Sequence, residues 1–412
     1  MANVSSSNGL EKRPKLRFPG FDEPWKTNIF DEIFSLLPNN TLSRADLASC
    51  GDVLNVHYGD VLIKYGSILD VESDEIPYIT TGKESKKQCY LSDGDVIIAD
   101  TAEDETVGKC TEIINTQNAK IEAGLHTIPC HPRTAYAPMF LGYYINSPYY
   151  HKQLIPLMQG VKVLSVSRSN IGNTLISAPV SYSEQEKIVD LLHLLDCRMR
   201  KQQEVIDNLK KYKRGVNNQI LSQIDNSYNC RLGSVCEIVG GGTPDTLHTE
   251  YWGNTVEWFT PSEIGKTKYV NNSVRKLSDI GLNNSSAKLL PIGTVLLTTR
   301  ATLGEMSIAK RECSTNQGFQ SLIPHTDRVS SEYLYYMQII IKPWCEKYAS
   351  GNTFREISKS ALSDCIVPVP DRARQEQIVK LLSSIDMLIG AEESILMSLS
   401  KIRHGLMQQL FI

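Results

Sequence analysis

Several features that mark common protein classes are absent from this 412-residue sequence. No stretch approaches the ~20 consecutive apolar residues that a membrane-spanning helix needs, so we expect no membrane partner. The N-terminal segment MANVSSSNGLEKRPKLRF contains no apolar core of a secretory signal, which makes a cytoplasmic location the expectation. The net charge of -3 is too small for a protein that coats nucleic acid by bulk charge alone, although a local basic face is compatible with it.

Motifs for metal binding and catalysis are missing as well. The ten cysteines form no C-x-x-C pair and no cluster with histidine, so we interpret them as small buried residues of a reducing compartment and predict no metal site. The GKT at 265–267 has Thr260 where a phosphate-binding loop needs glycine. The SPYY at 147–150 has serine where an adenine methyltransferase motif needs an amide or an acid. We therefore predict a non-catalytic chain without catalytic residues and without a cofactor of its own.

What the sequence does contain is an internal repeat. Residues 184–224 align with residues 374–411 at a shift of 190, so that Asp196 matches Asp386. Segments further upstream also align, but the centres of the two copies have diverged. Two copies that keep the scaffold and vary the centre indicate one architecture with two specificities. An old duplication without functional meaning is the alternative.

The C-terminal part of each copy has the heptad pattern of a coiled coil. Both seams carry polar residues at the same two places, Gln202 with Glu392 and Lys213 with Arg403, and polar seam positions are a means of fixing register. We infer that the two helices pack against each other, whereas a core-facing helix is the alternative for either one alone. The predicted coiled-coil spacer residues are Ile188, Leu192, Leu195, Met199, Ile206, Leu209, Val216, Ile220, Ile378, Leu382, Ile385, Ile389, Leu396, Leu399, Leu406 and Leu410.

The start, length and direction of these helices can also be predicted. Ser183 and Glu186 have the spacing of a capping box at the start of the first helix. About 36 residues per helix correspond to a rod of roughly 54 Å. The linker at 225–229 is short, which favours antiparallel pairing with one globular domain at each end of the rod.

The globular segments have an α+β pattern. Short β-type runs at 60–66, 95–100 and 294–299 are separated by turn residues, and helical patterns follow around 138–159 and 331–348. We predict two similar globular domains separated by two long helices that form an antiparallel coiled coil, as a pseudo-twofold internal repeat. The predicted boundaries are an N-terminal extension at 1–20, globular domain 1 at 21–182, spacer helix 1 at 183–225, globular domain 2 at 226–371 and spacer helix 2 at 372–412.

Candidate nucleic-acid contacts are basic, aromatic and hydroxyl side chains in the loops of these domains. Arg300 follows a strand pattern and leads a loop that closes at Gly304, a position from which a guanidinium reaches a base edge or a phosphate. A solvated side chain in a surface turn is the alternative for each candidate. The predicted DNA-binding residues are Lys64, Lys83, Lys86, Lys87, Trp258, Lys266, Lys268, Arg300 and Thr302.

With this duplicated pattern, the chain resembles the specificity subunit of type I restriction–modification enzymes. The helix starts QEKIVDLL and QEQIVKLL, each after a Pro-containing segment (ISAPV and IVPVP), carry the resemblance. GDVIIADTAEDETVGK at 94–109 and GTVLLTTRATLG at 293–304, the latter followed by NQGFQSLIP, add to it. The resemblance extends over nearly the whole chain from about residue 20.

The resemblance implies a role in DNA recognition. Each globular segment would be a target-recognition domain for one half of an asymmetric, bipartite site on double-stranded DNA, and the helices would set the gap between the halves. Two modification (methyltransferase) subunits would bind, and restriction (ATP-dependent translocase and endonuclease) subunits would join them. S-adenosylmethionine, ATP and Mg are then expected on those partner subunits. The alternatives are a recognition subunit of a related system whose partner fuses restriction and methylation, and a coiled-coil scaffold that binds no DNA.

Overall fold

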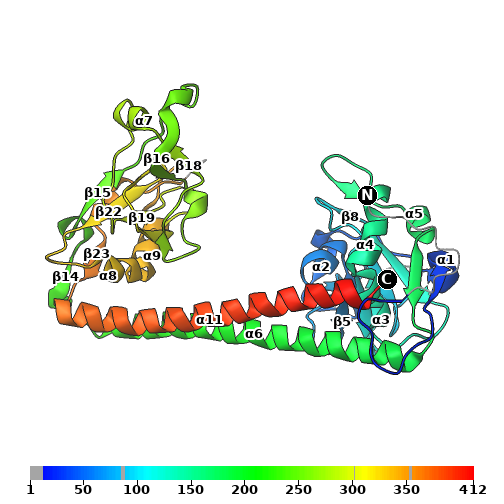
Figure 1. Cartoon of the computed structure of the whole chain (residues 1–412). Coiled ribbons are helices and arrows are strands. Elements are labelled where there is room, and N and C mark those ends of the chain that lie inside the picture. Colours follow the sequence, from blue (N-terminus) through cyan, green and yellow to red (C-terminus); the bar gives the residue numbers. More distant parts are fainter. Residues whose placement is uncertain (1–12, 85–88, 301, 352–354) are drawn as a thin grey trace. The chain divides into compact units, whose positions relative to one another are not determined.

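A computed structural model describes residues 13–84, 89–300, 302–351 and 355–412, so that the predicted contacts Lys86 and Lys87 lie outside the described residues. The chain divides into two compact units. Unit 1 consists of Met1–Gln202 and Ile395–Ile412, and unit 2 consists of Gln203–Ser394. Each unit contains one globular module together with part of each of two long helices, α6 (Tyr182–Ser222) and α11 (Arg372–Leu410) (Figure 1).

The globular module of unit 1 is built on a five-stranded sheet with the order β2-β11-β7-β9-β5. Its neighbours are antiparallel except for the edge pair β5 and β9, which is parallel. A four-stranded sheet with the order β10-β4-β6-β3 and the pairs β1-β13 and β12-β8 complete the module. The strands are β1 (Lys26–Ile29), β2 (Phe34–Leu36), β3 (Leu47–Ala48), β4 (Val53–Val56), β5 (Ile68–Asp70), β6 (Tyr78–Ile79), β7 (Val96–Ala99), β8 (Thr101–Ala102), β9 (Cys110–Ile114), β10 (Lys120–Ala123), β11 (Thr127–Pro132), β12 (Leu164–Ser165) and β13 (Leu175–Ala178). The helices are α1 (Phe30–Ile33), α2 (Tyr58–Ile63), α3 (Phe140–Ile145), α4 (Pro148–Leu154) and α5 (Arg168–Gly172).

The globular module of unit 2 repeats this topology. Its five-stranded sheet has the order β15-β22-β19-β20-β17, and again only the edge pair, β17 with β20, is parallel. A three-stranded sheet with the order β18-β16-β21 takes the place of the four-stranded one. The strands are β14 (Asn229–Arg231), β15 (Cys236–Gly240), β16 (Trp252–Phe259), β17 (Tyr269–Val270), β18 (Arg275–Leu277), β19 (Val295–Leu297), β20 (Met306–Ala309), β21 (Cys313–Thr315), β22 (Gln320–Pro324) and β23 (Ile366–Pro368). The helices are α7 (Asp279–Asn283), α8 (Ser331–Tyr336), α9 (Gln338–Tyr348) and α10 (Lys359–Ser363). The shared sheet order confirms the predicted internal repeat and the α+β class.

The last turn of α11 and the residue after it belong to the core of unit 1, although most of that core comes from the first 200 residues of the chain. Met407, Leu410 and Phe411 are buried in one apolar cluster with residues of β7, β9, α3 and the first turns of α6. The ring of Phe411 lies edge-on to the rings of Trp25 and Tyr144, with centroid distances of 6.5 and 5.6 Å. The module that begins the chain is therefore completed by residues close to position 412.

The start of α6 differs from the predicted capping box. The helix begins at Tyr182, and the Ser181 hydroxyl accepts a hydrogen bond from the Glu184 backbone N–H at 3.4 Å. Ser183 lies inside the helix, so the prediction of Ser183 and Glu186 as the capping pair is wrong by two residues. The cause is that Ser181 and Ser183 each have a glutamate three residues later, Glu184 and Glu186, and only the path of the chain out of β13 decides which serine precedes the helix.

The β-type run predicted at 60–66 is also wrong. These residues lie largely in α2, whose first turn is capped by the His57 ring, because its Nδ1 accepts from the Gly59 N–H at 3.2 Å. A short apolar run does not by itself distinguish a strand from one turn of helix. The other predicted runs are confirmed, since 95–100 contains β7 and 294–299 contains β19. The helical patterns are confirmed too, by α3 and α4 in unit 1 and α8 and α9 in unit 2.

Candidate nucleic-acid interface

Helices α6 and α11 pack together in opposite chain directions (Figure 1). In unit 1, Asp196 of α6 is paired with Arg403 of α11, and in unit 2, Lys213 of α6 is paired with Asp386 of α11. Residue numbers therefore rise along α6 while those of the α11 partners fall, as an antiparallel pair requires. All sixteen predicted seam residues are buried or half-buried. The predicted packing of the two helices in an antiparallel coiled coil is confirmed.

A cluster that we call the first anchor joins this helix pair to the globular module of unit 1. Arg403 Nε donates to Asp196 Oδ1 at 2.5 Å, and Arg403 Nη2 donates to the Ser67 hydroxyl at 3.3 Å. Tyr143 of α3 donates its hydroxyl to the other carboxylate oxygen of Asp196 at 3.1 Å. Burial and the neighbouring Asp196 charge raise the pKa of Tyr143, so that this hydroxyl stays a donor.

The second anchor has the same composition in unit 2. Lys213 Nζ lies 2.5 Å from Asp386 Oδ1, and Tyr336 of α8 donates its hydroxyl to Asp386 Oδ2 at 2.6 Å. Lys268, which directly precedes β17, donates to the hydroxyls of Tyr336 and Ser383, both at 3.0 Å. Burial lowers the pKa of Lys268 and raises that of Tyr336. Each anchor thus contains an aspartate, a cation from the opposite helix and a tyrosine from the first helix after the five-stranded sheet.

Sequence reasoning identified only part of these anchors. Lys213 and Arg403 were recognised as polar interruptions of the seam, but not as partners of Asp386 and Asp196. A signal was present, because the shift of 190 aligns Asp196 with Asp386 and Lys213 with Arg403. In an antiparallel pair, these equivalences place each aspartate opposite the cation of the other copy.

The predicted lysines of unit 1 are engaged within the protein. Lys64 Nζ donates to the backbone carbonyl of Glu75 at 2.6 Å. Lys83 donates to the carboxylate of Asp46. Hydrogen bonds from Lys83 and from Ser43 lower the pKa of Asp46 to about 2. Both lysines remain partly exposed, so their present partners compete with any contact to a phosphate.

The predicted residues of unit 2 fall into different environments. The Trp258 side chain is only 3% exposed and donates its indole N–H to the Gly242 carbonyl at 3.0 Å. Burial of this ring argues against the predicted contact, because no face is open for a base to stack on. Lys268 belongs to the second anchor, and its ammonium group points to hydroxyls of the protein. Lys266 and Thr302 are exposed.

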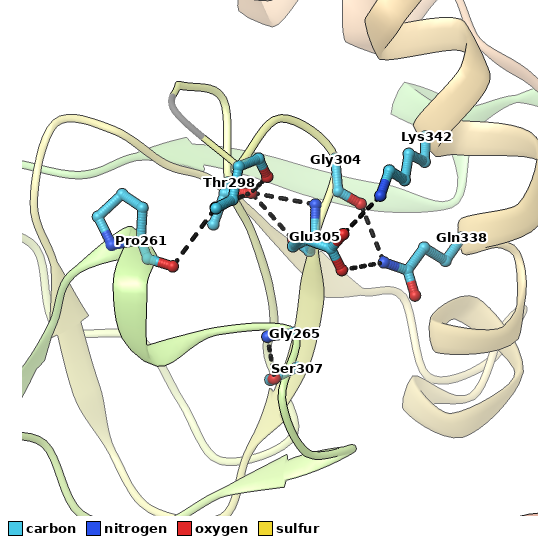
Figure 2. A network of polar contacts seen from close by, with 9 residues as sticks. Pro261, Gly265, Thr298, Gly304, Glu305, Ser307, Gln338 and Lys342 are labelled. Atoms are coloured by element: carbon cyan, nitrogen blue, oxygen red, sulfur yellow. Dashed lines mark hydrogen bonds and ion pairs between the residues drawn. The ribbon is translucent and has the colours of Figure 1, made fainter. Parts of the chain in front are cut away.

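The loop that carries Thr302 and Arg300 is held by a polar network (Figure 2). Glu305 accepts hydrogen bonds from Gln338 and Lys342 of α9, at 3.0 and 2.5 Å, and its backbone N–H donates to the Thr298 hydroxyl at 3.0 Å. The same glutamine also donates to the Gly304 carbonyl at 3.1 Å. Arg300 is paired with the Glu356 carboxylate at 2.8 Å. Hydrogen bonds from α9 therefore hold this loop in place, but its arginine already has an acidic partner.

In the part of the chain that the structure describes, no group of three or more His, Cys, Asp or Glu side chains is placed to hold a metal ion. No helix in that part is both long and apolar enough to cross a membrane. The ten cysteines are free, and burial raises the pKa of several of them, Cys236 to about 12.

Comparison with known proteins links these features to one family. Residues 224–401 match the family model described as the type I restriction modification DNA specificity domain. The type I restriction enzyme MjaIX specificity subunit of Methanocaldococcus jannaschii is 34% identical over 44% of this chain and 43% of its own length. The EcoR124I/EcoR124II specificity subunit of Escherichia coli is 25% identical over 51% of this chain and 54% of its own length. These two matches therefore span about half of each relative.

Longer but more distant matches cover almost the entire chain. The putative MjaX specificity subunit of M. jannaschii is 20% identical over 89% of this chain and 88% of its own length. A solved S subunit of a type I system from M. genitalium covers 97% of this chain and 99% of its own, with a TM-score of 0.53 and 14% identity. A chain from a structural study of complex assembly in the type I system has the same coverage, a TM-score of 0.61 and 20% identity. At these identities the solved structures support the fold alone. Residues 224–401 thus match a type I restriction modification DNA specificity domain, and the chain as a whole is similar to type I restriction enzyme specificity subunits.

Proposed function

We propose that this chain is the DNA sequence-specificity subunit of a type I restriction–modification complex. Its two modules, at 21–182 and 226–371, would each recognise one half of an asymmetric, bipartite site on double-stranded DNA. The observation that carries the proposal is the repeat of one five-stranded sheet order in both modules, beside a second sheet that differs between them. A symmetric dimer recognises a palindrome, whereas one chain with two unlike modules can recognise two unlike half-sites.

The paired helices are proposed to set the gap between the half-sites. α6 has 41 residues and α11 has 39, and their register is constrained by the two ion pairs of the anchors. Each helix at ~1.5 Å per residue has a length of roughly 60 Å, comparable with that of 17 or 18 base pairs of B-form DNA. Inserting one heptad into both helices should therefore lengthen the recognised gap or abolish binding, and an unchanged gap would contradict the spacer role.

Partner subunits are proposed to bind the outer face of the helix pair. Val205 and Ile395 occupy equivalent positions of the two copies and are 44% and 41% exposed. Seven residues later, Tyr212 and Ile402 are equivalent and are 60% and 55% exposed. An apolar pair that recurs once in each copy supports two equivalent binding sites, as two identical modification subunits would need.

Chemistry is proposed to reside on those partners. Modification subunits would supply methyl transfer with S-adenosylmethionine, and restriction subunits would supply ATP- and Mg-dependent translocation and cleavage. The net charge of -3 fits this division, because phosphate contacts from partner subunits add affinity without adding specificity. Lys266, Arg300 and Thr302 remain predicted DNA contacts of this chain.

The decisive experiment is to express the chain with its modification subunit and to sequence the methylated motifs of the host genome. We expect one two-part motif that disappears when the gene for this chain is removed. Replacing residues 230–370 by the matching segment of a relative should change one half of the motif and leave the other half intact. If no sequence-selective methylation or binding depends on the chain, a scaffold that binds only proteins would explain it better. A motif produced by a single partner that also cleaves DNA would favour the related fused system.

A further inference from the structure

A stacked arginine stands on the three-stranded sheet of unit 2, outside the residues predicted from the sequence. The guanidinium carbon of Arg275 lies 3.5 Å from the ring centroid of Trp252 and 5.5 Å from that of Trp258. The two indole rings are perpendicular, with centroids 5.1 Å apart. A separation of 3.5 Å is van der Waals contact, so the guanidinium is held against the face of the first ring.

The fold of β16 creates this arrangement. Trp252 and Val256 both pair with Leu277 of β18, so residues 253–255 form a bulge between them. The bulge brings Trp252 back beside Trp258, which is directly opposite Arg275 in the antiparallel register. Bulges of this kind redirect side chains and are frequent beside functional sites. Here the result is two tryptophan rings next to one arginine.

The rings of Trp252 and Trp258 are held in fixed orientations. Trp258 is buried in a small apolar cluster with Val256, Leu277 and Ala287, against which Trp252 also packs. The indole N–H of each ring donates to a backbone carbonyl, from Trp258 to Gly242 at 3.0 Å and from Trp252 to Asp245 at 3.3 Å. Both rings therefore have little freedom to reorient, and they restrict the plane of the guanidinium that lies over them.

The guanidinium of Arg275 is accessible to a ligand. Arg275 is exposed, and among the described residues its side chain has neither an ion-pair partner nor a hydrogen-bond acceptor. The neighbouring carboxylate, Glu257, is paired with Lys276 at 2.7 Å and accepts from Ser273. By contrast, Arg300 is paired with Glu356. Arg275 thus combines a fixed orientation with N–H donors that the protein leaves available.

We infer that Arg275, stacked on Trp252, is a specificity-determining residue that donates two hydrogen bonds to the major-groove edge of a guanine. This inference rests on the proposed function. A planar, preorganised fork matches the O6 and N7 acceptors of guanine, which arginine binds bidentately. The same fork can also bind a phosphate, but a phosphate contact carries no sequence information, so the two roles differ in their effect on the preferred base.

The test uses the full chain in complex with its modification subunit and a library of DNA duplexes with randomised positions. Sequencing of the bound duplexes gives the preferred motif of each variant. Arg275→Lys keeps the positive charge but removes the fork, and we expect it to lower the preference for guanine at one position by about 10- to 100-fold. That position should lie in the half-site of the 226–371 module, and the other half-site should stay unchanged. Trp252→Leu should relax the same position although the arginine is retained, whereas Trp252→Phe should keep the preference.

The matched control is Arg311→Lys, an exposed arginine of the same module that is not stacked on a tryptophan, and it should leave the motif unchanged. The inference is overturned if Arg275→Lys selects the wild-type motif, or if this control relaxes the same position equally. A uniform loss of affinity with a smaller salt dependence would also overturn it, because that outcome identifies a phosphate contact. If the wild-type complex selects no two-part motif, the proposed function fails as well, which distinguishes the two failures.

Discussion

The guanidinium of Arg403 on α11 lies 2.5 Å from the carboxylate of Asp196 on α6. The same pairing occurs in unit 2 with the helices exchanged, where Lys213 on α6 lies 2.5 Å from Asp386 on α11. In both units a tyrosine of the globular module donates to the aspartate. One duplicated pair of residues therefore connects the helices to each other and to both modules.

The pair Arg403 and Asp196 should contribute measurably to the stability of unit 1. Both side chains are about a quarter exposed, so solvent screens them only partly. A double-mutant cycle with Arg403→Ala and Asp196→Ala should give a coupling free energy of roughly 1–3 kcal/mol in urea unfolding. The control cycle is the exposed pair Arg372 and Glu376 within α11, for which we expect about 0.5 kcal/mol or less. Equal coupling in the two cycles would contradict a special role for the anchor.

Phe411 should be important for unit 1 although it lies at the far end of the sequence. Its side chain is 2% exposed and packs against Trp25, Phe140 and Tyr144. Replacement by alanine leaves a cavity among these rings, and we expect a loss of about 3–5 kcal/mol in the free energy of unfolding. Ile402→Ala on α11, the helix that ends directly before Phe411, is the control, because that side chain is 55% exposed and should change the free energy little. Denaturant unfolding followed by circular dichroism measures both, and similar values for the two variants would show that the aromatic contacts are not stabilising.

Glu112 should make the stability of unit 1 depend on pH. Its carboxylate is buried on β9 and accepts from the backbone N–H groups of Met139 and Gly142 at 2.5 and 2.7 Å. Burial raises the pKa of Glu112 from 4.5 to about 7, although those hydrogen bonds oppose the shift. An acid whose pKa is raised in the folded state holds its proton more tightly there, so stability is lost as the pH rises from about 4.5 to 7.

Comparison with Glu112→Gln isolates this effect, since glutamine stays neutral at every pH. Relative to that variant, the wild type should lose on the order of 3 kcal/mol between pH 4.5 and 8. The control substitution is Glu376→Gln on the surface of α11, which should give no such trend. A difference between wild type and Glu112→Gln that stays constant with pH would mean that folding does not shift the pKa of Glu112, contrary to this prediction.

The outer face of the helix pair should bind one partner copy per repeat. Tyr212→Glu and Ile402→Glu each place a charge on one of two equivalent exposed apolar positions. Each single variant should weaken one of the two proposed modification-subunit sites by about 30-fold or more, and the double variant should weaken both. Native mass spectrometry of the assembled complex counts the bound copies. The matched controls are Lys211→Glu and Lys401→Glu, which are exposed, adjacent and also equivalent between the repeats. Loss of binding in these controls would indicate a general charge effect and not an apolar site.

The sequence predicted the long helices better than the globular modules. Heptad spacing and matched polar positions such as Lys213 and Arg403 depend on residues close in sequence, and both recur in the structure. The run at 60–66 was predicted as a strand and forms α2, because a few apolar residues suit either state until the neighbouring sheet selects one. The capping residue of α6 was missed by two positions for a similar reason.

By itself, the sequence determined that this protein has two related halves and two long helices that pair, because periodicity and repetition are properties of the order of residues. Only the tertiary structure decided which side chains remain available at the surface. Arg300 meets Glu356 and Lys83 meets Asp46 across 56 and 37 positions of sequence. Arg275 instead lies on Trp252 and has no acidic partner among the residues that the structure describes. The physical reason is that a charge is paired or open according to what the folded chain brings within a few ångströms of it, and sequence order does not specify those distances.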